Sequence, residues 1–243
     1  AELVPFSDFE SAYGACASGD CDTAVLPFEN SSAGEVAAVT DLMFSGPLYI
    51  NKVEAIEAVQ NLLGCDGASL DTVTQVVSHP QALSQCADYI RRHGFTSHEY
   101  PNTASAAKMV AETGDVGMAA IGSAECAEIY GLKVVEARIN EASVNTTRFA
   151  AFSRAQSFSK TRDSHFILMF TVKNEAGSLA KTLNIIGAHG YNMSCLRSRP
   201  MKGLMWNYYF YVELDGNIDT REGRSMLTEL GTLCDKLKVA GSF

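Results

Sequence analysis

The sequence has 243 residues, of which 47% are hydrophobic and 19% are charged, a composition typical of a soluble globular protein with one large or two ordinary domains. Its net charge of -9 argues against a nucleic acid partner. No apolar run approaches the roughly 20 residues needed to cross a bilayer, so we expect no membrane partner. Residues 1–5 lack the basic and apolar regions of a signal peptide.

The cysteine pattern indicates reduced thiols. The sequence has 7 cysteines and no Cys-x-x-Cys pair. An odd number without paired spacing predicts a cytoplasmic protein rather than a disulfide framework or a zinc site. The 5 histidines are too scattered to suggest a metal site, so we expect no metal ligands.

The first two thirds of the sequence alternate between strands and helices. Strands are expected at 23–27, 73–77, 96–100, 116–121 and 133–136. Helices are expected at 7–18, with a capping box from Ser7 to Glu10, at 35–44, 80–92 and 103–112, and after Ser123. This alternation predicts an α/β domain with mainly parallel strands.

Several of these strands are followed by Ser, Thr or Asn at the start of a helix. Ligands of such domains bind at the carboxyl ends of strands, where helix N-termini offer free N–H groups to anions. Residues 29–34, Ser78, Thr103 and Ser123 occupy such positions. The alternative is that these residues only cap their helices.

Residues 145–149, Asn-Thr-Thr-Arg-Phe, precede an apolar run at 149–152 that is typical of a buried strand. Arg148 carries a permanent charge and a planar fork suited to a carboxylate. Thr147 can donate a hydrogen bond to an oxygen beside it. The pair suits an anionic substrate with a leaving hydroxyl; a Thr-rich turn with a solvated Arg is the alternative.

The last 80 residues have a different pattern. After a polar linker at 155–163, strands are expected at 165–172, 192–199, 205–214 and 238–240, with helices at 177–189 and 219–234. The second helix is expected to turn Met226, Leu227, Leu230 and Leu233 inward. The order βαββαβ predicts a ferredoxin-like sandwich, which leaves a sheet face or edge for a second copy to cover.

Several motifs, in this order and spacing, resemble the prephenate dehydratase family followed by an ACT regulatory domain. The motifs are Leu26-Pro27-Phe28-Glu29-Asn30-Ser31, the run from Ser78 to Cys86, Ala120-Ile121-Gly122-Ser123, Thr147-Arg148-Phe149, Gly177-Ser178-Leu179-Ala180 and Arg197-Ser198-Arg199-Pro200.

The resemblance implies a fold and a division into domains. Residues 1–154 would form a two-lobed catalytic region like that of periplasmic binding proteins, with the active site in the cleft between the lobes. Lobe one would comprise about 1–53 and 144–154, and lobe two about 54–143. Residues 164–243 would form the ACT domain.

The resemblance also implies the conversion of prephenate to phenylpyruvate, water and CO2 without a cofactor, inhibition by L-phenylalanine bound to paired ACT domains, and a homodimer or dimer of dimers. The site residues it implies fall into three groups. They are Thr147, Glu29 and Gln85 for catalysis; Asn30, Ser31, Ser78, Arg148 and Phe149 for substrate binding; and Gly177, Ser178, Leu179, Ala180, Asn192, Ser198, Arg199 and Pro200 for the effector.

Each catalytic residue type suits a step of that reaction. Thr147 would donate a hydrogen bond or a proton to the leaving hydroxyl, with a protonated Glu29 as the rival donor. Arg148 would clamp one carboxylate bidentately, and Ser78 with the helix start after it would take the other. Gln85, about two turns into that helix, would reach the same site.

The sequence departs from the family pattern in three places. It begins after the first strand and the Gly-Pro-x-Gly-Ser/Thr loop that help to build the cleft, so either these residues are missing from the sequence or the enzyme is impaired. Gln60 lies in a stretch where the family often has His. Arg197 replaces the usual Glu of the regulatory motif, which reverses a charge near the expected effector site.

Other hypotheses remain open. One is arogenate dehydratase, which uses the same residues on a substrate with an amine in place of the keto group. Another is a catalytically impaired module that senses an amino acid. A third is that the ACT domain serves only to dimerise the protein.

Overall fold

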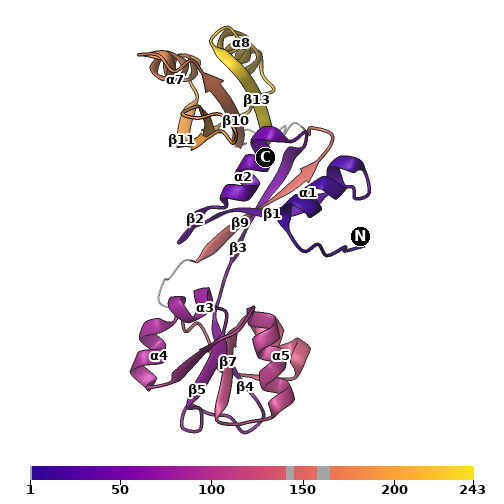
Figure 1. Cartoon of the computed structure of the whole chain (residues 1–243), viewed down its shortest axis with the longest axis vertical. Helices are drawn as coiled ribbons and strands as arrows, with labels where there is room; N and C mark the ends of the chain where they lie inside the picture. Colours follow the sequence, from indigo (N-terminus) through magenta and orange to yellow (C-terminus); the bar gives the residue numbers. More distant parts are fainter. Residues whose placement is uncertain (1, 141–144, 158–164) are drawn as a thin grey trace. The chain divides into compact units, whose positions relative to one another are not determined.

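The computed structural model describes residues 2–140, 145–157 and 165–243. The chain forms two compact units, residues 56–147 (the central unit) and residues 1–55 with 148–243 (the terminal unit) (Figure 1). The chain passes between them within two strands, β3 (Tyr49–Glu57) and β9 (Thr146–Ser153). The lobe crossing predicted near residue 143 and most of the predicted linker lie outside the described residues.

The central unit contains a five-stranded sheet in the order β6-β5-β7-β4-β8. Its strands are β4 (Asn61–Gly64), β5 (Gln75–Ser78), β6 (Thr96–Glu99), β7 (Met118–Gly122) and β8 (Lys133–Glu136). Strand β5 runs parallel to β6 and β7, but β4 runs antiparallel to β7 and β8. The prediction of mainly parallel strands is therefore only half right for this sheet.

Helices cover both faces of this sheet. They are α3 (Pro80–Gln85), α4 (Ala87–His93), α5 (Thr103–Thr113) and α6 (Ala124–Tyr130). Leu62 packs with the side chains of α3 and α4, whereas its neighbour Leu63 packs with those of α5 and α6, because successive strand residues point to opposite faces. Figure 1 shows α4 and α5 on opposite sides of the sheet.

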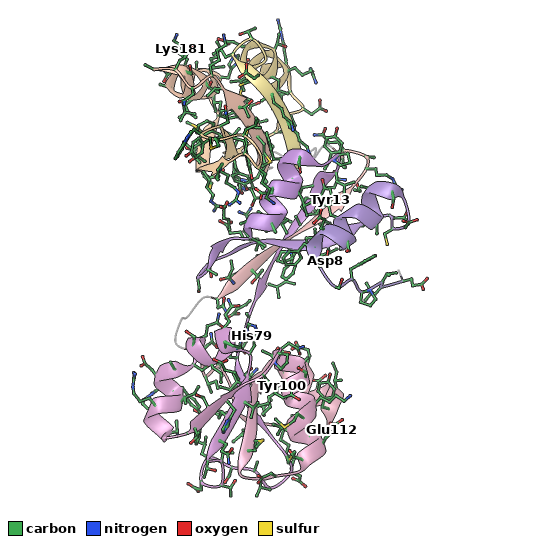
Figure 2. All side chains as sticks on the ribbon, viewed as in Figure 1. Asp8, Tyr13, His79, Tyr100, Glu112 and Lys181 are labelled. Carbon is green, nitrogen blue, oxygen red and sulfur yellow. The ribbon has the colours of Figure 1, made fainter. Side chains whose placement is uncertain are left out.

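The helix predicted over 80–92 is two helices. The chain leaves α-helical geometry at Cys86, where φ is -115° and ψ is 16°, and the Cys86 side chain is fully buried. At the start of α3, His79, which is labelled in Figure 2, caps the helix, since its Nδ1 accepts a hydrogen bond from the Gln81 N–H at 3.2 Å. This supports a structural role for His79.

The terminal unit contains an eight-stranded sheet in the order β11-β12-β10-β13-β3-β9-β1-β2. The remaining strands are β1 (Ala24–Asn30), β2 (Gly34–Glu35), β10 (His165–Val172), β11 (Asn192–Pro200), β12 (Tyr208–Asp215) and β13 (Cys234–Ser242). Its helices are α1 (Phe9–Ser18), α2 (Ala37–Ser45), α7 (Ser178–Ala188) and α8 (Arg221–Leu230). The C-terminal elements follow the predicted βαββαβ order, and the chain has a mixed α/β fold.

The two halves of this sheet join where β13 runs parallel to β3, with Gly241 opposite Ile50. A Cβ atom at Gly241 would lie 2.3 Å from the Ile50 carbonyl oxygen, so only glycine allows this approach. Lys238, also on β13, donates hydrogen bonds to the carbonyl groups of Met43 and Gly46 at 2.6 and 2.5 Å. The C-terminal strand is thereby fixed to β3 and to the end of α2.

Several predicted boundaries are wrong. Asp8, which is labelled in Figure 2, caps α1 in place of Ser7, and its carboxylate accepts a hydrogen bond from the Ser11 N–H at 2.7 Å. Strand β12 begins at Tyr208 rather than at 205, and β13 is much longer than 238–240. Leu233 lies beyond the end of α8 and is 38% exposed rather than buried. Among the described residues, no helix is long and apolar enough to cross a membrane.

Candidate functional site

Two of the predicted site residues meet in the terminal unit. Glu29 lies near the end of β1 and Arg148 near the start of β9, and these strands are neighbours in the sheet. Arg148 Nη1 donates a hydrogen bond to Glu29 Oε2 at 2.9 Å. Both side chains are mostly buried, with 27% of Arg148 and 20% of Glu29 exposed. The structure thus brings together a predicted catalytic carboxylate and a predicted binding cation.

Two residues that the sequence did not place at the site complete a cluster of alternating charge. Arg148 also binds Glu213 on β12, from Nη2 to Oε1 at 2.7 Å and from Nη1 to Oε2 at 2.9 Å. Arg197 on β11 pairs with the other oxygen of Glu29. We call these four residues, Arg197, Glu29, Arg148 and Glu213, the four-charge cluster.

Aromatic rings surround the four-charge cluster. The Arg148 guanidinium carbon lies 4.9 Å from the centre of the Phe28 ring and 5.9 Å from that of Phe243. The Arg197 guanidinium lies 5.5 Å from the Tyr211 ring, whose hydroxyl donates to Glu213 at 3.1 Å. Rings in this position attract a cation and exclude water, so the ion pairs are screened less than surface pairs.

The cluster decides the charge of Glu29. Burial raises the pKa of Glu29, but hydrogen bonds from Arg197 and Arg148 outweigh that effect and leave the pKa below its ordinary value. Glu29 is therefore ionised near neutral pH. This argues against the protonated Glu29 that the sequence allowed as a rival proton donor.

The cluster also revises the role predicted for Arg148. Burial lowers the pKa of Arg148, but the hydrogen bond and the charge interaction with Glu213 outweigh this effect and leave the pKa above its ordinary value. The side chain therefore stays cationic. Its bidentate face is already matched to the Glu213 carboxylate, whose side chain is only 8% exposed. A substrate carboxylate would have to displace Glu213 to be clamped in the predicted way.

The other predicted residues of this lobe form the turn after β1 and the start of β9. Asn30 accepts hydrogen bonds from the N–H groups of Ser32 and Ala33, each at 2.9 Å, and so closes the β1–β2 hairpin. Glu29 and Asn30 belong to β1, so the polar loop predicted from residue 29 begins later. Ser31 is exposed on the hairpin, and Phe149 is half-buried on β9.

Ser78 lies at the end of β5 in the central unit, as predicted, but its side chain is fully buried. Its hydroxyl donates a hydrogen bond to the Ile121 carbonyl at 2.6 Å. Because that bond uses the only proton of the hydroxyl, the side chain cannot also donate to an anion here. The prediction that Ser78 holds a substrate carboxylate is therefore not supported by this geometry.

Gln85, at the end of α3, lies in a group of three amides in the central unit. Its Oε1 accepts hydrogen bonds from Gln60 at 3.3 Å and from Asn145 at 2.9 Å. Asn145 immediately precedes β9, on which Thr147 is half-buried. Gln85 thus holds the segment that leads into Thr147.

Asn61 was not predicted as a site residue, although it is 4% exposed at the start of β4. It donates to the Gly122 carbonyl at 3.2 Å and accepts from the Arg138 N–H at 3.1 Å. The signal available in the sequence was an amide at the start of an apolar strand, next to Gln60. Asn61 holds β4, the end of β7 and the segment that returns from β8.

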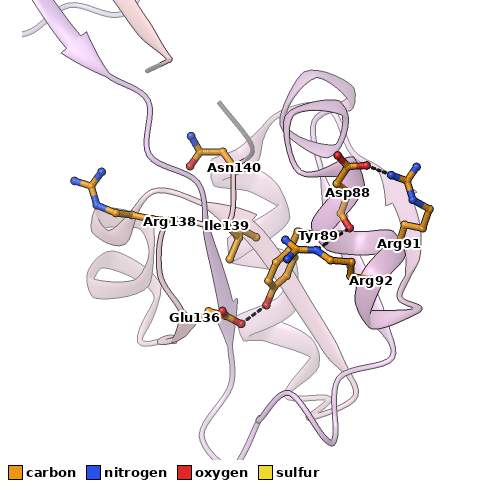
Figure 3. Close-up of a pocket in the computed structure, with 8 residues that line it drawn as sticks. All are labelled: Asp88, Tyr89, Arg91, Arg92, Glu136, Arg138, Ile139 and Asn140. Carbon is orange, nitrogen blue, oxygen red and sulfur yellow. Dashed lines mark hydrogen bonds and ion pairs between the residues drawn. The ribbon is translucent and has the colours of Figure 1, made fainter. Parts of the chain in front are cut away.

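A hollow of about 630 Å³ opens on the central unit beside this segment. Figure 3 shows its lining, which consists of Asp88, Tyr89, Arg91, Arg92, Glu136, Arg138, Ile139 and Asn140. Tyr89 donates to Glu136 at 2.6 Å, and Arg91 pairs with Asp88. Asn140 accepts from the Gln60 N–H at 3.2 Å, which connects this wall to the three amides. None of these arginines was predicted as a site residue.

The residues predicted to bind an effector lie in two places. Gly177 caps α7 with a φ of 84°, and Ser178, Leu179 and Ala180 form its first turn. Leu179 lines a hollow of about 230 Å³ with eight other residues of the C-terminal half. They are Val172, Lys173, Asn174, Glu175, Trp206, Asn207, Tyr208 and Phe210, of which Trp206 is also strongly exposed.

The predicted effector residues of β11 have other contacts. Asn192 donates to Asp215 at 2.6 Å. Arg199 donates to Asp41 on α2 at 3.0 Å and also binds Glu35 on β2. Among the described residues, the lining of the hollow beside Leu179 does not include Asn192, Ser198, Arg199 or Pro200. The prediction that Arg199 binds an effector is not supported by these contacts, since it joins β11 to α2 and β2.

Comparison with known proteins places this geometry in a family. The family model described as prephenate dehydratase matches residues 1–157. Prephenate dehydratase of Methanocaldococcus jannaschii is 34% identical over 201 residues, which cover 82% of this chain and 73% of that protein. The bifunctional chorismate mutase/prephenate dehydratase of Escherichia coli K12 is 31% identical over 237 residues, or 97% of this chain, which spans 61% of the length of that relative.

Solved structures have the same fold. Prephenate dehydratase of Staphylococcus aureus Mu50 has a TM-score of 0.86 and 27% identity, over 99% of this chain and 89% of that one. A prephenate dehydratase of Arthrobacter aurescens in complex with L-Phe has a TM-score of 0.87 at 24% identity, over 98% of this chain and 80% of that one. A structure described as GqqA, a novel type of quorum quenching acylases, has a TM-score of 0.86 at 29% identity, over 98% of this chain and 88% of that one.

Proposed function

The chain belongs to the prephenate dehydratase family, and from that premise we propose that it converts prephenate to phenylpyruvate, water and CO2. The observation that carries the proposal is the family match over residues 1–157, which contains every residue proposed for catalysis. Residues 1–154 are proposed as the catalytic region and 164–243 as an ACT regulatory domain.

The reaction requires the protein to help one group leave. The bond between the ring carbon and its carboxylate breaks, and its electron pair moves into the ring. The bond from the ring to its hydroxyl breaks at the same time, and the hydroxyl leaves as water after gaining a proton. Aromatisation makes the reaction downhill, so orientation and a positioned donor are what the protein must supply.

Thr147 is the proposed hydrogen-bond or proton donor to the leaving hydroxyl. The paired and ionised Glu29 is less suited to donate a proton. Glu29 instead offers a fixed negative charge that can accept hydrogen bonds from a bound hydroxyl. Gln85 is proposed to hold the segment before Thr147, because it binds Asn145.

Regulation by phenylalanine is proposed for the C-terminal half. The hollow beside Leu179 is small and lined by apolar and polar side chains, which suits one amino acid. The solved relative from Arthrobacter aurescens was crystallised in complex with L-Phe, which supports the same ligand for this chain. Strand β11 lies at the edge of the sheet, so a homodimer or dimer of dimers is proposed to pair there.

Arogenate is the second candidate substrate. An Arabidopsis thaliana relative named arogenate dehydratase/prephenate dehydratase 1 is 28% identical over 257 residues.

The experiment compares turnover of prephenate and of arogenate by the purified 243-residue chain, with and without phenylalanine. We expect phenylpyruvate from prephenate at the highest kcat/KM, with inhibition by phenylalanine. Faster turnover of arogenate would change the substrate. Turnover of neither ring compound by folded protein would contradict the proposal, and phenylalanine binding without turnover would identify an impaired sensing module.

A further inference from the structure

Glu213 is a buried carboxylate in the C-terminal half of the chain, outside the region matched by the family model. Glu213 is 6% exposed, and both of its carboxylate oxygens accept hydrogen bonds from Arg148 on β9. A buried carboxylate is costly to desolvate unless it is paired in this way. The contact therefore determines where the Arg148 guanidinium lies.

Strands β11 and β12 of the eight-stranded sheet place two charges on one face. In the pairing of β11 with β12, Arg197 lies opposite Tyr211, and Glu213 lies two residues farther along β12. Residues two apart on a strand point to the same side of the sheet. Arg197 and Glu213 thus face the first lobe together, one against Glu29 and the other against Arg148.

Through the four-charge cluster, the position of the Glu213 carboxylate determines the positions of the Arg148 guanidinium and of the Glu29 carboxylate. Glu213 binds both Nη atoms of Arg148, and Nη1 of Arg148 also binds Glu29. Two forks and two carboxylates in contact fix planes as well as distances. Thr147 immediately precedes Arg148 on β9, so the contacts that hold Arg148 also restrict the backbone next to Thr147.

We propose that Glu213 is a positioning residue for the dehydratase reaction, acting through Arg148 on Glu29 and on the start of β9. This rests on the proposed function. It gives strand β12, in the C-terminal half of the chain, a role in positioning the catalytic residues, because the carboxylate that orders Arg148 lies on that strand. Arg148 binds protein rather than substrate through its bidentate face.

The test is the effect of Glu213→Gln on kcat and KM for prephenate in the full-length chain, alone and together with Arg148→Gln. We expect Glu213→Gln to lower kcat about ten- to a hundredfold, as small misplacements of reacting groups do, with KM within about threefold. Because Glu213 acts through Arg148, the double variant should be within about twofold of Arg148→Gln alone.

Glu229→Gln is the matched control. It neutralises a carboxylate of the same C-terminal half that is 55% exposed and bound to His189 rather than to the cluster. Its kcat should equal that of the wild type. Thermal unfolding of each variant shows whether it is folded. Should Glu213→Gln not fold, Glu213→Asp keeps the charge but withdraws it by one methylene, and it should lower kcat in the same direction.

Two results would overturn the inference while the proposed function stands. One is a folded Glu213 variant with wild-type kcat. The other is a double variant whose losses multiply, since this would mean that Glu213 acts independently of Arg148. An inactive but folded wild-type chain would instead refute the proposed function, and the positioning role would fall with it.

Discussion

Arg148 on β9 donates to both oxygens of Glu213 on β12, at 2.7 and 2.9 Å, within the terminal unit. The same guanidinium binds Glu29 at 2.9 Å. A cation that the sequence presents as a substrate clamp is thus the centre of an internal ion network. The stability of the terminal unit and the geometry of the proposed catalytic residues therefore depend on the same contacts.

Removing Glu213 should destabilise the terminal unit. Glu213→Ala leaves the mostly buried Arg148 with one carboxylate in place of two, and loss of one partner of a buried pair costs about 3–5 kcal/mol. Since Arg148 is 27% exposed, we expect the lower end of that range in the free energy of unfolding, measured by urea denaturation. Glu229→Ala removes a carboxylate that is 55% exposed and should change the free energy of unfolding less; equal effects would contradict the account.

Acid should weaken the protein through Glu29. The pKa of Glu29 is lowered in the folded state, so between that value and the ordinary 4.5 the unfolded chain binds more protons and stability rises with pH. The contribution is fully present above 4.5 and is lost as pH falls through the lowered pKa. Urea midpoints at a series of pH values should fall more steeply for the wild type than for Glu29→Gln. Parallel curves would contradict the pairing.

The joint between β13 and β3 should be intolerant of a side chain at Gly241. In Gly241→Ala the new Cβ would lie 2.3 Å from the Ile50 carbonyl oxygen, so backbone must shift. We expect a loss of about 2 kcal/mol or more, seen as a lower Tm. Gly187→Ala is the control, because nothing lies within 4 Å of that position in α7, and it should be neutral or stabilising by up to about 1 kcal/mol.

Phenylalanine binding should depend on Leu179 more than on Arg199. Leu179 lines the hollow of the C-terminal half, whereas Arg199 is held by Asp41 and Glu35. Leu179→Ala should weaken the binding of phenylalanine measured by calorimetry about tenfold, the effect expected for loss of an apolar contact. Arg199→Gln should lower the Tm but retain binding. The opposite pattern would restore Arg199 as an effector residue.

Local features of this fold can be read from the sequence. Gly19, Gly94, Gly114 and Gly131 each end a helix in the left-handed conformation, where glycine is least strained. The apolar run after Arg148 is a strand with Ala150 and Phe152 fully buried, as predicted. These signals lie within a few residues of the structures they specify.

Contacts between distant segments could not be read in this way. Arg148 and Glu213 are 65 residues apart, and a charge pattern does not show which of 28 acidic residues an arginine will meet. The joining of β13 to β3 depends on the register of two strands from different halves of the chain. The burial of Ser78 could not be predicted, because the sequence pattern of a serine before a helix does not distinguish a side chain that faces a ligand from one that donates to the Ile121 carbonyl.

The most direct test of the central claim is the rate of phenylpyruvate formation from prephenate by the wild-type chain and by Thr147→Ala. Thr113→Ala serves as control, since this hydroxyl on an exposed residue donates to the carbonyls of Met109 and Val110 in its own helix. We predict turnover by the wild type and the control, and a kcat at least about tenfold lower for folded Thr147→Ala. Phenylpyruvate formed no faster than in buffer by folded wild type, or equally fast by Thr147→Ala, would contradict the account.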